Sequence, residues 1–204
     1  MTEITVSRGL AELHLLDKKI RKTIEKAKYI AVKTKTKSLD VSKFKIEAKS
    51  DLQSINDLIK RRNMIKAAVV KSNAVTTVKI GKNEYTVADA IERKQSIQYE
   101  KILLSSLQQQ RSQLIQQLNE HELAIKNKLD RLLEVEFGKD VKSNVDNVNS
   151  ITQSYLENNN MEYIDPIDID STISQLENSI NEFESEVDLV LVESNAITKI
   201  ILSD

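Results

Sequence analysis

Residues 72–87, SNAVTTVKIGKNEYTV, contain the signals that decide the fold. Ser72 and Asn73 follow a long stretch of helical spacing, and Ser, Asn and Thr favour helix ends because they compete for backbone hydrogen bonds. The residues that follow alternate strand-forming side chains on both sides of Gly81, where the sequence GKN supplies a turn. The stretch therefore predicts a helix end followed by a β-hairpin at about 77–87.

Long helices are predicted on both sides of this hairpin. Upstream, Asp40 or Ser42 can cap a helix whose apolar stripe is Phe44, Ala48, Leu52, Ile55, Ile59, Ile65 and Val69. Downstream, Thr86 and Asp89 have the spacing of a capping box and predict a helix that begins near Val87. Its stripe is nearly a heptad: Ile97, Leu104, Leu107, Leu114, Leu118, Ile125 and Leu132. Gly138, which suits the left-handed position after a helix, predicts the end.

The two ends of the chain repeat the helical pattern. Apolar residues spaced by three and four predict a helix from Ile4 to about Ala31, followed by VKTKTKS (32–38), a short strand or a basic loop that closes a helical hairpin or contacts phosphates. Near the other end, Asp170 or Ser171 can cap a last helix, and the tail ITKIIL (197–202) alternates like a strand.

The predicted fold class is mainly α, with long antiparallel helical hairpins or a coiled coil and the small β-hairpin. We predict one elongated domain over 1–204, with a helical hairpin at 1–75, the β-hairpin at 76–87, a long helix at 88–137, a linker with a short helix at 138–170, and a C-terminal helix and strand at 171–204. Apolar stripes that one thin hairpin cannot bury alone predict a homo-oligomer.

The stretch ESNAITK (193–199) repeats KSNAVTT (71–77) at a distance of 122 residues. Both copies are expected to end a helix and precede a strand. The simplest geometry adds the C-terminal strand to the β-hairpin, which brings the two copies together in space.

Composition narrows the class of protein. The chain of 204 residues has no Cys, 3 Gly and 1 Pro, which favours long helices and excludes thiolate chemistry. No apolar run approaches the roughly 18 residues that span a bilayer, and the first residues lack the order of a signal peptide. We expect a cytoplasmic protein without a membrane partner. Net charge is -1, but residues 1–49 carry a net +7 and residues 160–204 a net -10.

We predict no catalytic site, no metal site and no cofactor. His121-Glu122 is half of a zinc-protease motif, but Ile125 stands where the second His is required. Asp165, Asp168 and Asp170 lack the order of an EF-hand and are interpreted as a turn and a helix cap. The sequence therefore indicates a protein that is not an enzyme.

The repeated motif is the best candidate for a binding site. Ser, Asn and Thr offer neutral donors and acceptors, and nearby basic residues offer charge. The candidate ligand-binding residues are Ser72, Asn73, Thr76, Thr77, Arg93, Ser194, Asn195 and Thr198. The alternative is that both motifs are helix-to-strand elbows whose side chains bind only their own backbones.

Residues 72–97 resemble the septicolysin-like family of bacterial proteins and its relatives in tailed phages of Gram-positive hosts. The matching positions are Asn73, Ala74, Thr76, Thr86, Val87, Ala90, Ile91 and Arg93. A late helix with an Asn-containing end matches 192–200, but the family's aromatic residue after Asn195 is absent here. The resemblance implies a helical hairpin with a small β element, oligomerisation and no established activity.

Two functions follow as hypotheses. One is a phage accessory protein of the host cytoplasm that sequesters a small anionic ligand, such as a nucleotide signal of host defence. The alternative is a structural coiled-coil component of a virion or its assembly pathway. Nucleic-acid binding is disfavoured because no aromatic residues lie among the basic ones in a stacking pattern and the whole chain is not basic.

Overall fold

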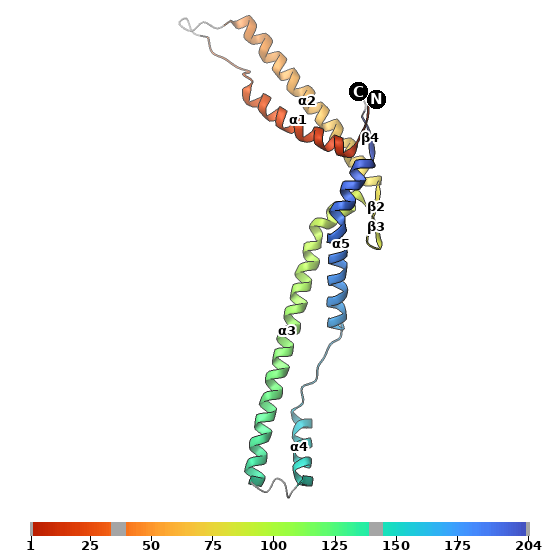
Figure 1. Ribbon diagram of the computed structural model, residues 1–204. Helices are drawn as coiled ribbons and strands as arrows, with labels where there is room; N and C mark the ends of the chain where they lie inside the picture. Colours follow the sequence, from red (N-terminus) through yellow and green to blue (C-terminus); the bar gives the residue numbers. More distant parts are fainter. Residues whose placement is uncertain (1, 34–39, 139–144, 203–204) are drawn as a thin grey trace. The chain divides into compact units, whose positions relative to one another are not determined.

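The computed structural model describes residues 2–33, 40–138 and 145–202, and helices predominate in it, which confirms the mainly α fold class (Figure 1). The chain divides into two compact units. The first unit comprises Met1–Ser96 and Asn181–Asp204, and the second comprises Ile97–Ile180. Most of the stretch 32–38 lies outside the described residues, and Val32 and Lys33 have no regular secondary structure.

Helices α1 (Val6–Lys26) and α2 (Val41–Val75) lie side by side in the first unit as the predicted helical hairpin (Figure 1). Asp40 caps α2, since its side chain accepts a hydrogen bond from the backbone N–H of Lys43 at 3.0 Å. The buried stripes of the two helices meet in a cluster that also holds residues of two strands: Ile4, Val6, Leu13, Leu16, Ile65, Val69, Ile200 and Leu202.

The predicted β-hairpin is confirmed. Strands β2 (Thr77–Ile80) and β3 (Asn83–Thr86) pair antiparallel, with Thr77 opposite Thr86. Gly81 has a φ of 58° in the turn, a backbone conformation that costs Gly little and other residues more. Helix α3 (Val87–Phe137) begins and ends where predicted: the hydroxyl of Thr86 accepts from the N–H of Asp89 at 3.0 Å, and Gly138 has a φ of 52°.

The prediction that the C-terminal strand extends this hairpin is wrong. Strand β4 (Lys199–Leu202) pairs antiparallel with β1 (Thr2–Thr5), so the two ends of the chain lie together (Figure 1). Ile200 and Leu202 point from β4 into the core cluster against α1 and α2, and burial of these two side chains accounts for the position of the strand. The predicted helix from Ile4 begins instead at Val6, because the four residues before it form β1.

The two halves of the chain have similar orders of elements, each with helices between a first and a last strand, and the second half has one helix more. The first half runs β1–α1–α2–β2, and the second runs β3–α3, then α4 (Val145–Asn159), α5 (Ile169–Ile197) and β4. Each half gives its first strand to the last strand of the other, in the same register: Thr5 faces Lys199 as Thr86 faces Thr77. The sequence EITV (3–6) recurs as EYTV (84–87), which accompanies the recurrence of SNA(V/I)T.

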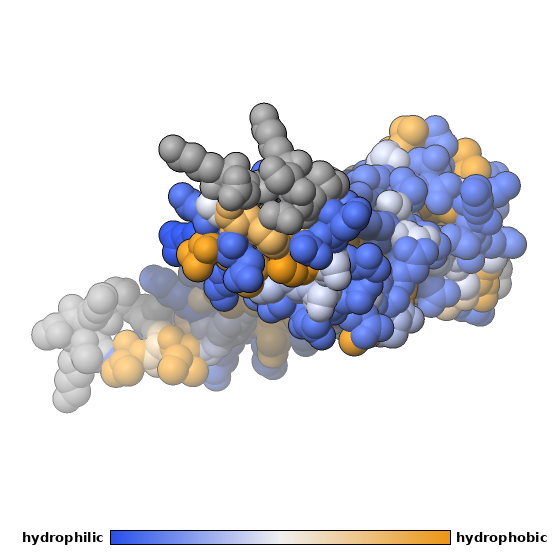
Figure 2. Space-filling view, turned by 90° about the horizontal axis from the view of Figure 1, so that it is seen from below, coloured by the Kyte–Doolittle hydropathy of each residue, from blue (hydrophilic) through white to orange (hydrophobic). Residues whose placement is uncertain are grey.

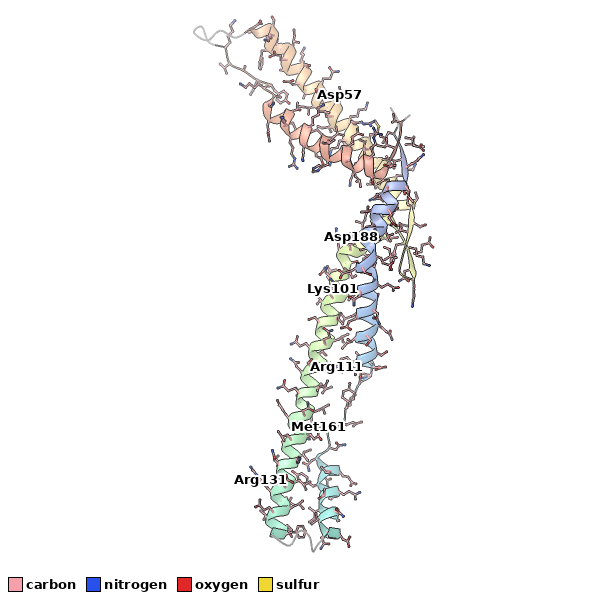
Figure 3. All side chains as sticks on the ribbon, in the orientation of Figure 1. Asp57, Lys101, Arg111, Arg131, Met161 and Asp188 are labelled. Atoms are coloured by element: carbon pink, nitrogen blue, oxygen red, sulfur yellow. The ribbon has the colours of Figure 1, made fainter. Side chains whose placement is uncertain are left out.

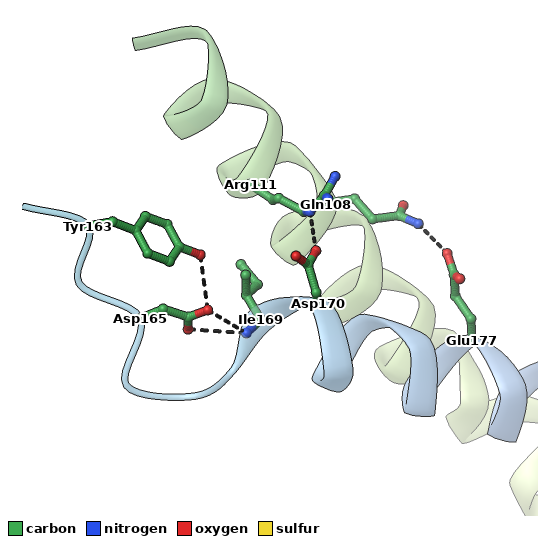
Figure 4. Close-up of polar contacts among 7 residues, drawn as sticks. All are labelled: Gln108, Arg111, Tyr163, Asp165, Ile169, Asp170 and Glu177. Carbon is green, nitrogen blue, oxygen red and sulfur yellow. Dashed lines mark hydrogen bonds and ion pairs between the residues drawn. The ribbon is translucent and has the colours of Figure 1, made fainter. Parts of the chain in front are cut away.

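The second unit contains most of α3, all of α4 and the start of α5. Gln108 of α3 donates to Glu177 of α5 at 2.5 Å, and Arg111 of α3, labelled in Figure 3, forms an ion pair with Asp170 (Figure 4). The imidazole Nε2 of His121 on α3 lies 2.8 Å from the backbone oxygen of Asn159, the last residue of α4. These polar contacts tie α3 to both of the later helices.

The predicted cap of α5 at Asp170 or Ser171 is wrong, because both residues lie inside the first turn. A φ of 50° at Asp168 turns the chain so that the carboxylate of Asp165 reaches the N–H of Ile169, at 2.9 and 3.1 Å (Figure 4). This backbone hydrogen bond, together with one from the hydroxyl of Tyr163, holds the pKa of Asp165 below its ordinary value.

The start of α5 is therefore expected to depend on pH. The pKa of Asp165 is lower in the folded chain than in the unfolded chain, so the ionised carboxylate stabilises the start of α5. This stabilisation is fully present above the unfolded pKa and is lost as the pH falls through the folded pKa. Asp165→Asn should speed hydrogen exchange at Ile169 and Thr172, whereas Asp168→Asn should not, since Asn tolerates the left-handed conformation. An Asp165 pKa measured by NMR at or above about 3.9, the peptide value, contradicts this prediction.

Candidate binding site at the two elbows

Two helix-to-strand elbows carry the repeated motif, as predicted. The first elbow is residues 72–77 with Thr86 and Val87, and the second elbow is residues 194–199 with Thr5 and Val6. In each elbow a helix ends, a single residue turns the chain, and a strand begins. The strand pairing assigns the elbows to different two-stranded sheets.

The backbone of both elbows is closed by equivalent hydrogen bonds. The N–H of Thr76 donates to the oxygen of Ser72, and that of Thr198 donates to the oxygen of Ser194, both at 2.9 Å. The first residue of the next helix then donates to the elbow: Val87 to the oxygen of Thr76, and Val6 to that of Thr198, again at 2.9 Å. Each elbow thus joins the C-terminus of one helix to the N-terminus of another.

The hydroxyl groups of the elbows differ in their surroundings. Ser194 is buried, with 8% of its surface exposed, while Ser72 is half-buried with its Oγ 3.5 Å from that of Thr76. Thr5 and Thr86 were not predicted as site residues, although each caps the helix that starts at its elbow. The recurrence of EITV (3–6) as EYTV (84–87) is a sequence signal that could have identified them.

The two Asn side chains are not needed to close the elbows. Asn73 and Asn195 are half-buried, and over residues 2–33, 40–138 and 145–202 neither amide group makes a hydrogen bond to the protein. The amide atoms are not among the buried polar atoms that lack a partner, so solvent or a ligand can reach them. The interpretation that these side chains bind only their own backbones is therefore not supported for Asn, and the elbows present two amide groups with unused donors and acceptors.

Most of the basic residues near the motif are used elsewhere. Arg61 pairs with Glu12 at 2.8 Å and Arg62 pairs with Asp17 at 2.5 Å, both across the α1–α2 hairpin. The Arg93 guanidinium lies 5.0 Å from the ring centre of Phe183 and 5.9 Å from that of Tyr85, which gives it a cation–π packing role. Its predicted role in ligand binding stays a prediction. Lys66 and Lys71 are exposed and, in the part of the chain that the structure describes, have no ion-pair partner.

Other kinds of site find no support in the described residues. They contain no group of three or more His, Asp or Glu side chains that could hold a metal ion, and no helix among them has the length and apolar character needed to cross a membrane. Comparison with protein-family models, curated proteins and solved structures finds no match to this chain.

Proposed function

We propose that the protein is a non-enzymatic, homo-oligomeric binding protein that sequesters a small anionic, nucleotide-like ligand at the elbows. The observation that carries this proposal is the pair of half-buried Asn amides, at equivalent positions of two equivalent elbows, that have unused hydrogen-bonding groups. An Asn amide can donate and accept hydrogen bonds at once, so it can recognise a polar ligand that offers a matching acceptor and donor. Arg93, a predicted ligand-binding residue that lies against Tyr85 and Phe183, supplies positive charge for a phosphate group.

The biological setting of the proposal is a phage accessory protein with an anti-defence role in the host cytoplasm. Its support is the resemblance of residues 72–97 to the septicolysin-like family and its phage relatives. A nucleotide signal of host defence is a small anionic molecule, and a protein that binds it without turnover removes it from its receptor. The absence of a predicted catalytic set in the sequence suits binding of this kind.

The proposal is tested by equilibrium dialysis against AMP, ADP, cyclic AMP and cyclic di-AMP. We expect the wild type to retain at least one of them, and Asn73→Ala and Asn195→Ala each to weaken its retention by at least about tenfold, which corresponds to about 1.4 kcal/mol. An amide left without its partner costs about 1–3 kcal/mol. Asn56→Ala, an exposed Asn of the same helix α2, is the matched control and should bind like the wild type.

Two outcomes would contradict the proposal. One is that the wild type retains none of these nucleotides. The other is that both Asn variants bind normally and instead lower the melting temperature in an additive way, as independent structural sites do. That second result would leave the elbows with a structural role alone.

A second candidate is a structural component of a virion or its assembly pathway. The observation that favours it is a set of exposed apolar side chains on α3, with Tyr99 at 76%, Ile102 at 66% and Leu103 at 52% exposure. Helices in larger assemblies bury such side chains against neighbours. Mass spectrometry of purified virions distinguishes the candidates, since a structural component is present in them and a cytoplasmic binding protein is not.

A further inference from the structure

The repeat has opposite charges in its two copies. Residues 59–75 of α2 and residues 181–197 of α5 are equivalent, since each ends in SNA(V/I) and each precedes a strand of the same register. The α2 stretch contains five basic residues and no acidic one, whereas the α5 stretch contains five acidic residues and no basic one. Equivalent positions such as Lys71 and Glu193 carry opposite charges.

Both helices also present an exposed face of equivalent shape. On α2 it consists of Asn63, Lys66, Ala67, Val70 and Ala74 with Lys71 at its edge, and on α5 of Ser185, Asp188, Leu189, Val192 and Ala196 with Glu193 at its edge. These residues recur at the three- and four-residue spacing of a helix seam. The other sides of the same helices are buried, through Ile65 and Val69 on α2 and through Val187 and Leu191 on α5. We call the exposed sets the α2 face and the α5 face.

The apolar residues on the two faces are more exposed than a core position allows. Val70 is 55% exposed, Val192 is 64% exposed and Leu189 is 62% exposed. Although hydrophilic residues predominate on the surface in Figure 2, hydrophobic groups remain visible between them. Two helix faces with aliphatic centres and flanking charges of opposite sign have the composition of an interface core with a polar rim.

We propose that the α2 face of one chain binds the α5 face of a second copy. Charge complementarity identifies the partner: two α2 faces repel each other, as do two α5 faces, whereas α2 against α5 places Lys66 and Lys71 near acidic residues. Within the described residues Lys66, Lys71 and Glu193 have no ion pair inside their own chain, so they are available for one between chains. Asp188, labelled in Figure 3, already forms an ion pair with Lys94 of α3 within its own chain, so it contributes less.

The proposed contact joins unlike surfaces, so it is heterologous. Such a contact closes into a ring or propagates as a filament, unless both faces of two chains meet at once in a dimer. The inference rests on the homo-oligomer of the proposed function but not on its ligand. If the protein assembles but retains no nucleotide, the proposed ligand is therefore wrong and the proposed contact between copies still stands.

The test reverses charge on one face at a time in the full chain. The α2 variant carries Lys66→Glu and Lys71→Glu, and the α5 variant carries Leu189→Lys and Glu193→Lys. We expect light scattering to give a wild-type mass above the 23.2 kDa of one chain. Each variant alone should self-associate at least about tenfold more weakly. Lys45→Glu, an exposed change on α2 outside the face, should assemble like the wild type, and circular dichroism should show all variants folded.

Mixing the two variants is the decisive arm. Each has one reversed face, and the reversed faces are complementary to each other, so an equimolar mixture should regain a complex that neither forms alone. A misfolded variant cannot produce this rescue. A monomeric wild type at high micromolar concentration, a variant that keeps the wild-type mass, or a mixture that stays monomeric would overturn the proposal.

Discussion

Replacing Leu202 with Asp is expected to destabilise the first unit by about 4 kcal/mol or more, since loss of a buried Leu side chain alone costs about 2–5 kcal/mol. Leu202 has 0% exposure and lies in the core cluster with residues of α1 and α2. The new carboxylate must either stay charged or take up a proton in an apolar site, which adds to the cost. Urea unfolding followed by circular dichroism, at fixed protein concentration, measures the effect.

Ile201→Asp is the matched control for this substitution. Ile201 is the neighbouring residue of β4 but points to the other face, where 64% of its surface is exposed. A polar side chain there should change the unfolding free energy by no more than about 0.5 kcal/mol. Equal effects of the two substitutions would show that residues 199–202 are not a strand packed on this core.

Ile65→Ala is expected to cost about 2–5 kcal/mol, through lost apolar contact and the cavity left behind. Ile65 is fully buried on α2, where it meets the strand residues of the core cluster. Ile46→Ala, at the other end of the same helix and 70% exposed, removes the same atoms from a position in contact with solvent. We expect Ile65→Ala to lower the unfolding free energy measured in urea much more than Ile46→Ala does. Similar losses for the two substitutions would mean that the strands do not cover α2 at Ile65.

The helices and the β-hairpin were predictable because their signals are local. Asp40 caps α2, Thr86 caps α3 and Gly138 ends α3, and in each case the residues that set the boundary lie within a few positions of it. The start of α5 was missed although its signal is also local. The left-handed turn at Asp168 lets the carboxylate of Asp165 reach the first N–H of the helix. Position 168 is Asp and not Gly, the residue that would have indicated such a turn.

The partner of the C-terminal strand could not be predicted from a local pattern. Strand β1 is four residues long, and Ile4 fits the spacing of the following helix as well as that of a strand. Pairing of β1 with β4 joins the two ends of the chain, so it depends on which side chains the core of the first unit buries. The recurrence of EITV (3–6) as EYTV (84–87) contained the missing signal. Since EYTV lies at the end of a strand that precedes a helix, EITV predicts a strand before α1 as well.

The candidate site was predictable in its residues but not in its arrangement. The SNA(V/I)T repeat identified both elbows, and in the structure its Ser and Thr residues lie at the two ends of the backbone hydrogen bond that closes each elbow. Only the structure shows that the side chains of Asn73 and Asn195 take no part in closing the elbows. It also shows that Arg93 packs against the rings of Tyr85 and Phe183. Our expectation that the two motifs form one shared site stays a prediction.

The most direct test of ligand binding at the elbows is an NMR titration that follows the side-chain amide signals of Asn73 and Asn195. Isotope-labelled wild type is titrated with the nucleotide that dialysis shows to be retained, and Asn56 serves as the internal reference. We predict that the signals of Asn73 and Asn195 shift in parallel and saturate together, while that of Asn56 does not move. Saturable binding that leaves both elbow amides unchanged would contradict it.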